Sequence, residues 1–252
     1  AFKSGLEKVT VPIFEYGLPV EYELVRSINT VASGKRKRVG VVETDARLMG
    51  GTVMQGMQVQ PVSRHLLIEE LQKQYEVEAV DLSVPVAPDT FDALIAVQPS
   101  SLDPQSFGRF LDAVRSGVPV ALFEDPAPVG TGYITPTGTP KQSPGSMFGG
   151  GGVTPKGEIR ELWDLLELDV PGTPGMQGVF TPDVVWQQHN PYPTLDDRAN
   201  ELWVFIDEDS PGATEGQALS ADSPITSGMK EVLAIIPGAV NAKPDGLLEH
   251  TA

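Results

Sequence analysis

Three groups of polar residues in this sequence carry side chains suited to catalysis or ligand binding, and each directly follows an apolar run. The candidate ligand-binding residues are Thr44, Asp45 and Arg47, then Gln98, Ser100 and Ser101, and finally Glu124 and Asp125. Carboxylates brought together from such groups can hold Mg²⁺ or act as an acid–base pair. The alternative, which we prefer, is that these side chains form turns and cap helices.

A second candidate is the aromatic loop 186–193, whose sequence is WQQHNPYP. Its residues Trp186, His189 and Tyr192 are candidates for an interaction surface, with Trp186 as a stacking platform. An edge strand that buries its tryptophan in the core explains the same pattern equally well.

The composition excludes several kinds of chemistry. The chain has no cysteine, which rules out disulfides, thiol nucleophiles and zinc–thiolate sites. Its 34 acidic and 18 basic residues give a net charge of −16, which argues against nucleic acid as a partner. The acidic turn that starts at Asp207 fails as a calcium loop because Pro211 and Ala218 stand at ligand positions. The sequence also lacks the G-x-S-x-G, G-x-x-x-x-G-K-[ST] and H-E-x-x-H motifs, and we expect no catalytic residue, no metal and no cofactor.

The elements that position these residues alternate along the first half of the chain. Apolar runs predict buried strands over 39–42, 76–82, 91–97 and 118–123. Helical periodicity predicts a helix that opens at Pro61 and another from Phe107 that stops at Gly117. This alternation is typical of an open, mostly parallel α/β sheet with helices on both faces, for which we expect the strand order 2-1-3-4. Ligands of such sheets bind beyond the carboxyl ends of the strands, where the three polar groups lie.

The rest of the chain adds shorter elements. We expect a lead-in segment over 1–34 with a helix at 21–31, and a single α/β domain over 35–240. That domain has a core at 36–126, a Gly/Pro-rich loop at 126–154 and additions at 155–240, followed by a truncated tail at 241–252. Within the additions, the pattern predicts a helix that begins at Thr154–Pro155, strands at 184–187 and 202–206, and a buried strand at 232–236. The two ends suggest a fragment of a longer protein. The basic run 35–38 is a solvated linker or, alternatively, a contact with anionic lipid or an acidic partner.

Several segments resemble the extracytoplasmic domain of the GldG-like auxiliary components of ABC-type transport systems, a family named for bacterial gliding motility. The resemblance extends over about residues 15–240, and its segments keep their order and spacing. They are VEYELVRSI (20–28), RVGVVETD (38–45), EELQKQYEV (69–77), DALIAVQPSSL (92–102), FEDP (123–126), PKGE (155–158), VWQ (185–187), NPYP (190–193) and SGM (227–229).

This resemblance implies a flavodoxin-like fold, related to glutamine-amidotransferase-like domains but without their nucleophile. It also implies a location on the extracytoplasmic (periplasmic) side of the bacterial cytoplasmic membrane, with anchoring segments outside this chain. The implied partners are the permease and ATPase subunits of the transporter, and the family carries over no catalytic residues.

Three functions follow as hypotheses. The first is a non-catalytic domain for protein interaction or ligand sensing beside the permease, as a monomer or homodimer. The second is a carboxylate-dependent hydrolase or metal-dependent transferase that uses Asp45, Glu124 and Asp125. The third is a binding domain for a glycan or small polar ligand, with the loop at 126–152 as a lid and Trp186 as the platform.

Overall fold

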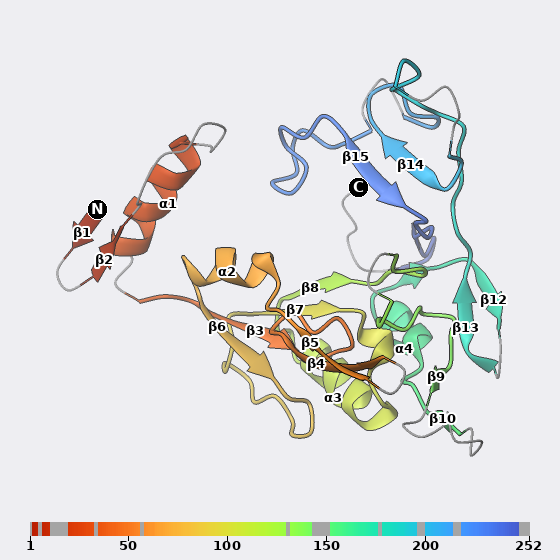
Figure 1. The fold of residues 1–252 in the computed structure, drawn as a ribbon, viewed down its shortest axis with the longest axis horizontal. Coiled ribbons are helices and arrows are strands. Elements are labelled where there is room, and N and C mark those ends of the chain that lie inside the picture. Colours follow the sequence, from red (N-terminus) through yellow and green to blue (C-terminus); the bar gives the residue numbers. More distant parts are fainter. Residues whose placement is uncertain are drawn as a thin grey trace. The chain divides into compact units, whose positions relative to one another are not determined.

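The computed structural model describes most of the chain, which forms two compact units. The described residues are 2–4, 7–10, 20–32, 35–55, 58–129, 132–142, 152–175, 178–195, 200–213 and 218–246. The first unit comprises Ala1–Val97 and Gly108–Leu122, and the second comprises Gln98–Phe107 and Phe123–Ala252. Figure 1 shows the elements of both units along the chain.

The first unit is built on a parallel four-stranded sheet. Its strands are β3 (Arg38–Val42), β6 (Glu76–Val80), β7 (Ala93–Val97) and β8 (Val120–Phe123). They lie in the order β6-β3-β7-β8 (Figure 1), so the four predicted strands and the predicted order 2-1-3-4 are confirmed. A mixed α/β fold with a parallel sheet is therefore established.

Glycine in the central strand β3 is explained by close packing. A Cβ atom on Gly40 would lie 2.6 Å from Val80 Cγ2 and 2.7 Å from Leu94 Cδ2, the side chains of the two neighbouring strands. Real Cβ atoms do not approach other atoms so closely. Only glycine lets β3 sit between β6 and β7 with these apolar neighbours in place.

The helices of the first unit bury apolar faces, but one begins later than the pattern predicts. Helix α3 (Pro104–Arg115) covers the predicted helix, and its Phe110 and Leu111 are almost fully buried. Helix α2 (Leu66–Gln72) does not open at Pro61, because Pro61 lies in β5 (Gln58–Val62), which pairs with β4 (Gly51–Gln55) as a hairpin. The helix starts instead where the His65 side chain accepts a hydrogen bond from Leu67 N (3.2 Å).

The N-terminal part of this unit contains a short hairpin and a helix. Strands β1 (Phe2–Ser4) and β2 (Glu7–Val9) pair antiparallel, and α1 (Val20–Ala32) confirms the helix predicted at 21–31. In α1, Arg26 and Glu23 form a buried ion pair one turn apart. No helix among the described residues combines the length and the apolar character needed to cross a membrane.

The second unit consists of small antiparallel pairs around one short helix. The short 3-10 turn η1 (Pro99–Ser101) follows β7. Helix α4 (Ile159–Leu165) begins at Ile159, not at Thr154–Pro155, because Glu158 caps it by accepting from Arg160 N (3.3 Å). Its Trp163 meets Phe180 edge to face, with ring centroids 5.2 Å apart. The strand pairs are β9 (Lys141–Gln142) with β10 (Val153–Thr154), β11 (Leu168–Asp169) with β16 (Asn241–Ala242), β12 (Gly172–Pro174) with β13 (Phe180–Pro182), and β14 (Trp203–Ile206) with β15 (Val232–Ile235).

Two strand expectations in this unit need correction. Residues 184–187 form no strand, since only Val184 makes an isolated bridge, to Gly238. The strand expected at 232–236 exists as β15, but it is not buried. Its side chains alternate, and Leu233 and Ile235 are exposed, because β15 pairs with β14 alone instead of entering a covered sheet. Parts of the expected lid loop (130–131 and 143–151) and of the tail (247–252) lie outside the described residues, as do residues 196–199 and 214–217.

Candidate functional site

The polar group after β3 belongs to the first unit and forms a tight turn. Thr44 Oγ1 donates to Val97 O at the end of β7 (2.5 Å) and accepts from Ala46 N (3.2 Å). Arg47 N donates to Thr44 O (3.2 Å), and Arg47 is exposed with a left-handed φ of 49°. Asp45 lies half-buried between them. The hydroxyl of Thr44 therefore ties the ends of two neighbouring strands together.

The other two polar groups belong to the second unit, and they meet around Gln98. This side chain is only 2% exposed, and its backbone has a left-handed φ of 56°. Its amide Nε2 donates to Glu124 Oε1 (3.0 Å) and to Asp125 O (2.9 Å), and its Oε1 accepts from Asp125 N (3.1 Å). Gln98 thus bonds to both the main chain and a side chain of the third group.

The carboxylate of Glu124 is held by donors from two further segments. Its Oε2 accepts from Ser100 N (3.2 Å), and its Oε1 accepts from Thr137 Oγ1 (2.5 Å). Burial raises the pKa of Glu124 above its usual value, although the hydrogen bonds from Ser100 and Thr137 and the charge of Lys156 act in the opposite direction. This is a desolvated carboxyl group whose two oxygens both accept hydrogen bonds from the protein's own donors.

The loop that follows Asp125 is fixed by this cluster. Lys156 Nζ donates to the carbonyl oxygens of Pro136 (3.0 Å), Thr137 (3.0 Å) and Thr139 (3.2 Å). Lys141 Nζ likewise donates to Ser101 O (2.9 Å). With Thr137 also bonded to Glu124, the described residues 135–141 are anchored at both ends and are not positioned as an open lid.

Asp125 takes the turn-forming role. Its Oδ1 accepts from Ala127 N (2.8 Å), two residues along the chain. Among the residues that the structure describes, no group of three or more His, Asp or Glu side chains is arranged to hold a metal ion. The cluster around Gln98 and Glu124 therefore matches the structural alternative for this edge better than a catalytic one.

A pocket of about 400 Å³ lies beside this cluster within the second unit. Ser100, Thr137, Lys156 and Phe180 are among the residues that line it. Thr137 and Lys156 were not among the candidates from the sequence. A threonine and a lysine in a Gly/Pro-rich stretch have no spacing pattern that would have marked them.

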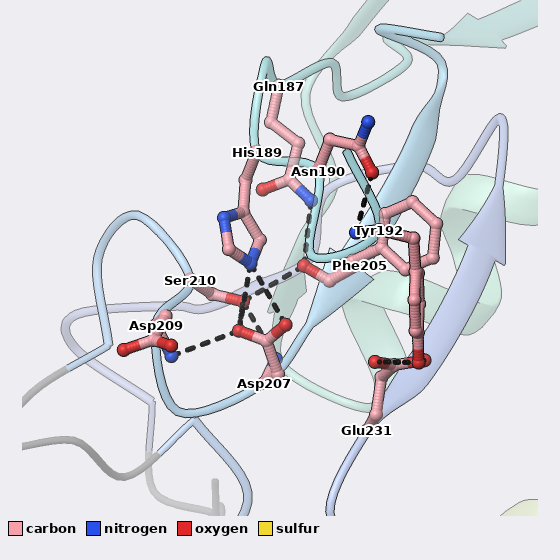
Figure 2. A network of polar contacts seen from close by, with 9 residues as sticks. All are labelled: Gln187, His189, Asn190, Tyr192, Phe205, Asp207, Asp209, Ser210 and Glu231. Atoms are coloured by element: carbon pink, nitrogen blue, oxygen red, sulfur yellow. Dashed lines mark hydrogen bonds and ion pairs between the residues drawn. The ribbon is translucent and has the colours of Figure 1, made fainter. Parts of the chain in front are cut away.

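The aromatic loop is held to the end of β14 by a polar network (Figure 2). His189 Nε2 lies 2.9 Å from both carboxylate oxygens of Asp207. Ser210 Oγ donates to Phe205 O (2.9 Å), which also accepts from Gln187 Nε2 (2.7 Å). Burial by itself would raise the pKa of Asp207, but hydrogen bonds, with His189 first among them, lower it below its usual value.

The order of groups in this network argues against a nucleophilic triad. In a Ser–His–Asp triad the histidine stands between the hydroxyl and the carboxylate, so that it can take the hydroxyl proton. Here Ser210 Oγ lies 3.2 Å from Asp207 Oδ1, and His189 bonds to the same carboxylate from another direction. Asp207 is thus the centre of the network, and His189 does not stand between the serine and the carboxylate as a triad requires.

The two aromatic candidates of the loop have different surroundings. Tyr192 OH donates to both oxygens of Glu231 (3.0 and 2.8 Å), and this bond raises the tyrosine pKa (Figure 2). Its ring meets Phe205 edge to face at 5.7 Å. Trp186 is 62% exposed, which contradicts the alternative of a tryptophan tucked into the core, and it borders a pocket of about 390 Å³ together with Phe205 and Ser210.

The residues proposed from the sequence therefore fall into three places. Thr44, Asp45 and Arg47 lie in the first unit, Gln98 with its partners forms one cluster in the second unit, and the aromatic loop forms another. Comparison with protein-family models finds no match, and comparisons with the curated proteins and with the solved structures find none either.

Proposed function

We propose that this chain is the extracytoplasmic domain of a GldG-like auxiliary component of an ABC-type transport system. In this role it has no catalysis of its own and acts in protein interaction or ligand sensing beside the permease. The order and spacing of the segments from VEYELVRSI to SGM support the family. The strand order β6-β3-β7-β8 supports its flavodoxin-like fold, because 2-1-3-4 is the order at the start of that fold.

The non-catalytic role is supported mainly by the hydrogen bonds that the Glu124 side chain accepts after β8. Glu124 accepts hydrogen bonds from Ser100, Thr137 and Gln98, which leaves it committed to anchoring a loop. A general acid or base must reach a substrate proton at hydrogen-bond distance. Both oxygens of Glu124 already accept from internal donors, and a substrate would have to compete with these donors for them.

The test is co-purification from membranes. The full-length protein is affinity-tagged and solubilised mildly, and the permease and ATPase encoded with it are sought by immunoblot and mass spectrometry. Both subunits are expected in the eluate and absent from a control purification of an equally abundant tagged membrane protein. Recovery of intact full-length protein without its permease contradicts the proposal.

One observation favours a second candidate, a glycan-binding domain. An exposed indole such as Trp186 beside a pocket of about 390 Å³ is the arrangement in which a sugar ring stacks on an aromatic face. A glycan array with the purified chain tests it. Binding that is lost in Trp186→Ala and kept in Leu195→Ala, a control residue with 83% exposure outside that pocket, supports this candidate, and an array without binding removes it.

A further inference from the structure

The outer edge of β15 carries backbone groups that no neighbouring strand satisfies. In the antiparallel pair, Trp203 lies opposite Ile235 and Phe205 lies opposite Leu233. Ile236 N donates to Leu202 O (2.8 Å). The backbone N–H and C=O groups of Ile236, and of every second residue before it, therefore point toward β14. The N–H and C=O groups of Leu233 and Ile235 therefore point away from β14, and none of the residues that the structure describes bonds to them.

The corresponding edge of β14 is closed, which makes the two edges of the pair different. Phe205 O accepts from Gln187 Nε2 and Ser210 Oγ (Figure 2), and Trp203 N donates to Asn200 O (2.8 Å). Side chains and a turn thus occupy the positions where another strand would pair with β14. Two of the outward backbone groups of β14 are thus occupied, whereas those of Leu233 and Ile235 in β15 have no partner among the described residues.

The side chains at this edge form an exposed apolar face. Opposite residues of an antiparallel pair share a face, so Trp203, Leu233 and Ile235 lie together. They are 43%, 40% and 37% exposed, while Val204 on the other face is 8% exposed. Edge strands are commonly protected by lysine, proline or a bulge, and Val232–Ile235 has none of these.

The charged residues beside this face favour some binding segments over others. At the end of the pair where Ile206 lies opposite Val232, the flanking carboxylates outnumber the single base Lys230. They are Asp207, Glu208, Asp209 and Glu231. A segment that pairs with β15 is therefore favoured if it carries positive charge beside its apolar residues, whereas a second copy of this chain would bring another net charge of −16.

We propose that β15 binds an extended segment of a partner protein as an added strand, and that this segment alternates apolar and basic residues. The main chain of the segment pairs with Leu233 and Ile235, and its apolar side chains cover Trp203 and its neighbours. Ile236 ends the binding edge, because its left-handed φ of 53° turns the chain out of the strand. The inference rests on the proposed interaction function and adds to it the contact surface and the chemistry of the partner.

The probe is a short capped peptide that alternates lysine and valine. Backbone amide exchange, followed by NMR on the whole chain, is expected to slow at least about tenfold at Leu233 and Ile235 when the peptide binds. A peptide with glutamate in place of lysine is expected to bind at least about tenfold more weakly. A lysine–valine peptide that is N-methylated at every residue keeps the charge but has no backbone N–H to pair along either edge, and it is expected to leave the exchange unchanged.

Substitutions test whether the peptide binds at β15. Leu233→Lys and Ile235→Lys are expected to weaken peptide binding at least about tenfold. Met54→Lys, which changes a 68% exposed residue on the hairpin β4–β5, is the matched control and is expected to leave binding unchanged. Circular dichroism and thermal unfolding confirm that each variant is folded.

Each of the following results overturns the inference. These are equal binding of the N-methylated peptide, equal weakening by Met54→Lys, and sedimentation that shows a dimer whose formation protects Leu233 and Ile235. The inference and the proposed function fail separately. Absence of peptide binding with the permease still co-purified removes only the inference, while protected amides without permease recovery remove only the transport role.

Discussion

The side-chain amide of Gln98 and the main chain of Asp125 bond to each other in both directions. Nε2 donates to Asp125 O at 2.9 Å, and Oε1 accepts from Asp125 N at 3.1 Å. The glutamine thereby acts as one further residue of backbone pairing beyond the ends of β7 and β8. A residue that the sequence nominates as a ligand contact is in fact a structural link between two strand ends.

Replacing this amide should cost stability. Gln98→Ala removes both bonds to Asp125 and leaves buried polar groups without partners, so the free energy of unfolding should fall by about 2 kcal/mol. Urea unfolding followed by circular dichroism measures it. Gln188→Ala is the control, because Gln188 is exposed and its bond to Glu201 is at the surface. Equal losses for the two variants would contradict the linking role.

Replacing glycine by alanine should change the free energy of unfolding in opposite directions at two positions. Gly40→Ala places a methyl group against Val80 and Leu94 and should lower the free energy of unfolding by about 1–3 kcal/mol. Gly108→Ala, within α3 and with open space around the new methyl group, should raise it by about 0.5–1 kcal/mol. Thermal and urea unfolding of the pair test the close packing of β3. A stabilising Gly40→Ala would show that β3 is not packed as tightly as described.

The carboxyl group of Glu124 should make the protein less stable as pH rises. Because its pKa is raised by burial, the folded state binds its proton more tightly than the unfolded state does. Its contribution to stability is complete below the ordinary value of 4.5 and is lost as pH increases through the raised value. Glu124→Gln should therefore gain stability relative to the wild type as pH increases.

Urea unfolding at a series of pH values from about 4 to 8 measures this difference. The exposed residue Glu208 provides the control, since Glu208→Gln should follow the wild-type profile over the same range. Parallel profiles for Glu124→Gln and the wild type would mean that Glu124 has no such linkage.

Asp207 should have the opposite pH dependence. Its pKa is lowered by His189 and neighbouring donors, so its contribution is present above its ordinary value of 3.8 and is lost as the pH falls through the lowered value. Asp207→Asn should flatten the acid side of the stability profile. Asp209→Asn, which keeps the backbone N–H that bonds to Asp207, should not. An acid profile that is steeper in Asp207→Asn than in the wild type would be inconsistent with the network in Figure 2.

The parallel sheet could be predicted from the sequence, and most of the second unit could not. Runs such as Val39–Val42 and Leu94–Val97 are locally apolar and short, which is the pattern of strands buried on both faces. The run Val232–Ile235 has the same composition, yet it lies in a two-stranded pair with one open face. Composition alone does not distinguish a covered strand from an uncovered one, because coverage is decided by distant segments.

The candidate residues show a similar limit. The sequence marks Gln98, Ser100, Glu124 and Asp125 because they follow strands, and in the structure these residues bond to one another. Their partners Thr137 and Lys156 come from loop segments without periodicity, so no local signal identifies them. Pro61 illustrates the reverse case, since a residue that commonly opens helices occupies an edge position of a hairpin instead.

The interleaving of the two units along the chain has a consequence for synthesis. The chain passes from one unit to the other after residues 97, 107 and 122, and only the second unit continues beyond that point. As the protein leaves the ribosome, all strands of the parallel sheet emerge before Thr137 and Lys156 do. The segment that carries Gln98 and Ser100 must therefore remain without its later partners while the first unit folds. A translational pause shortly after residue 122 would prolong the exposure of these polar groups, whereas a pause after residue 156 has left the ribosome would not.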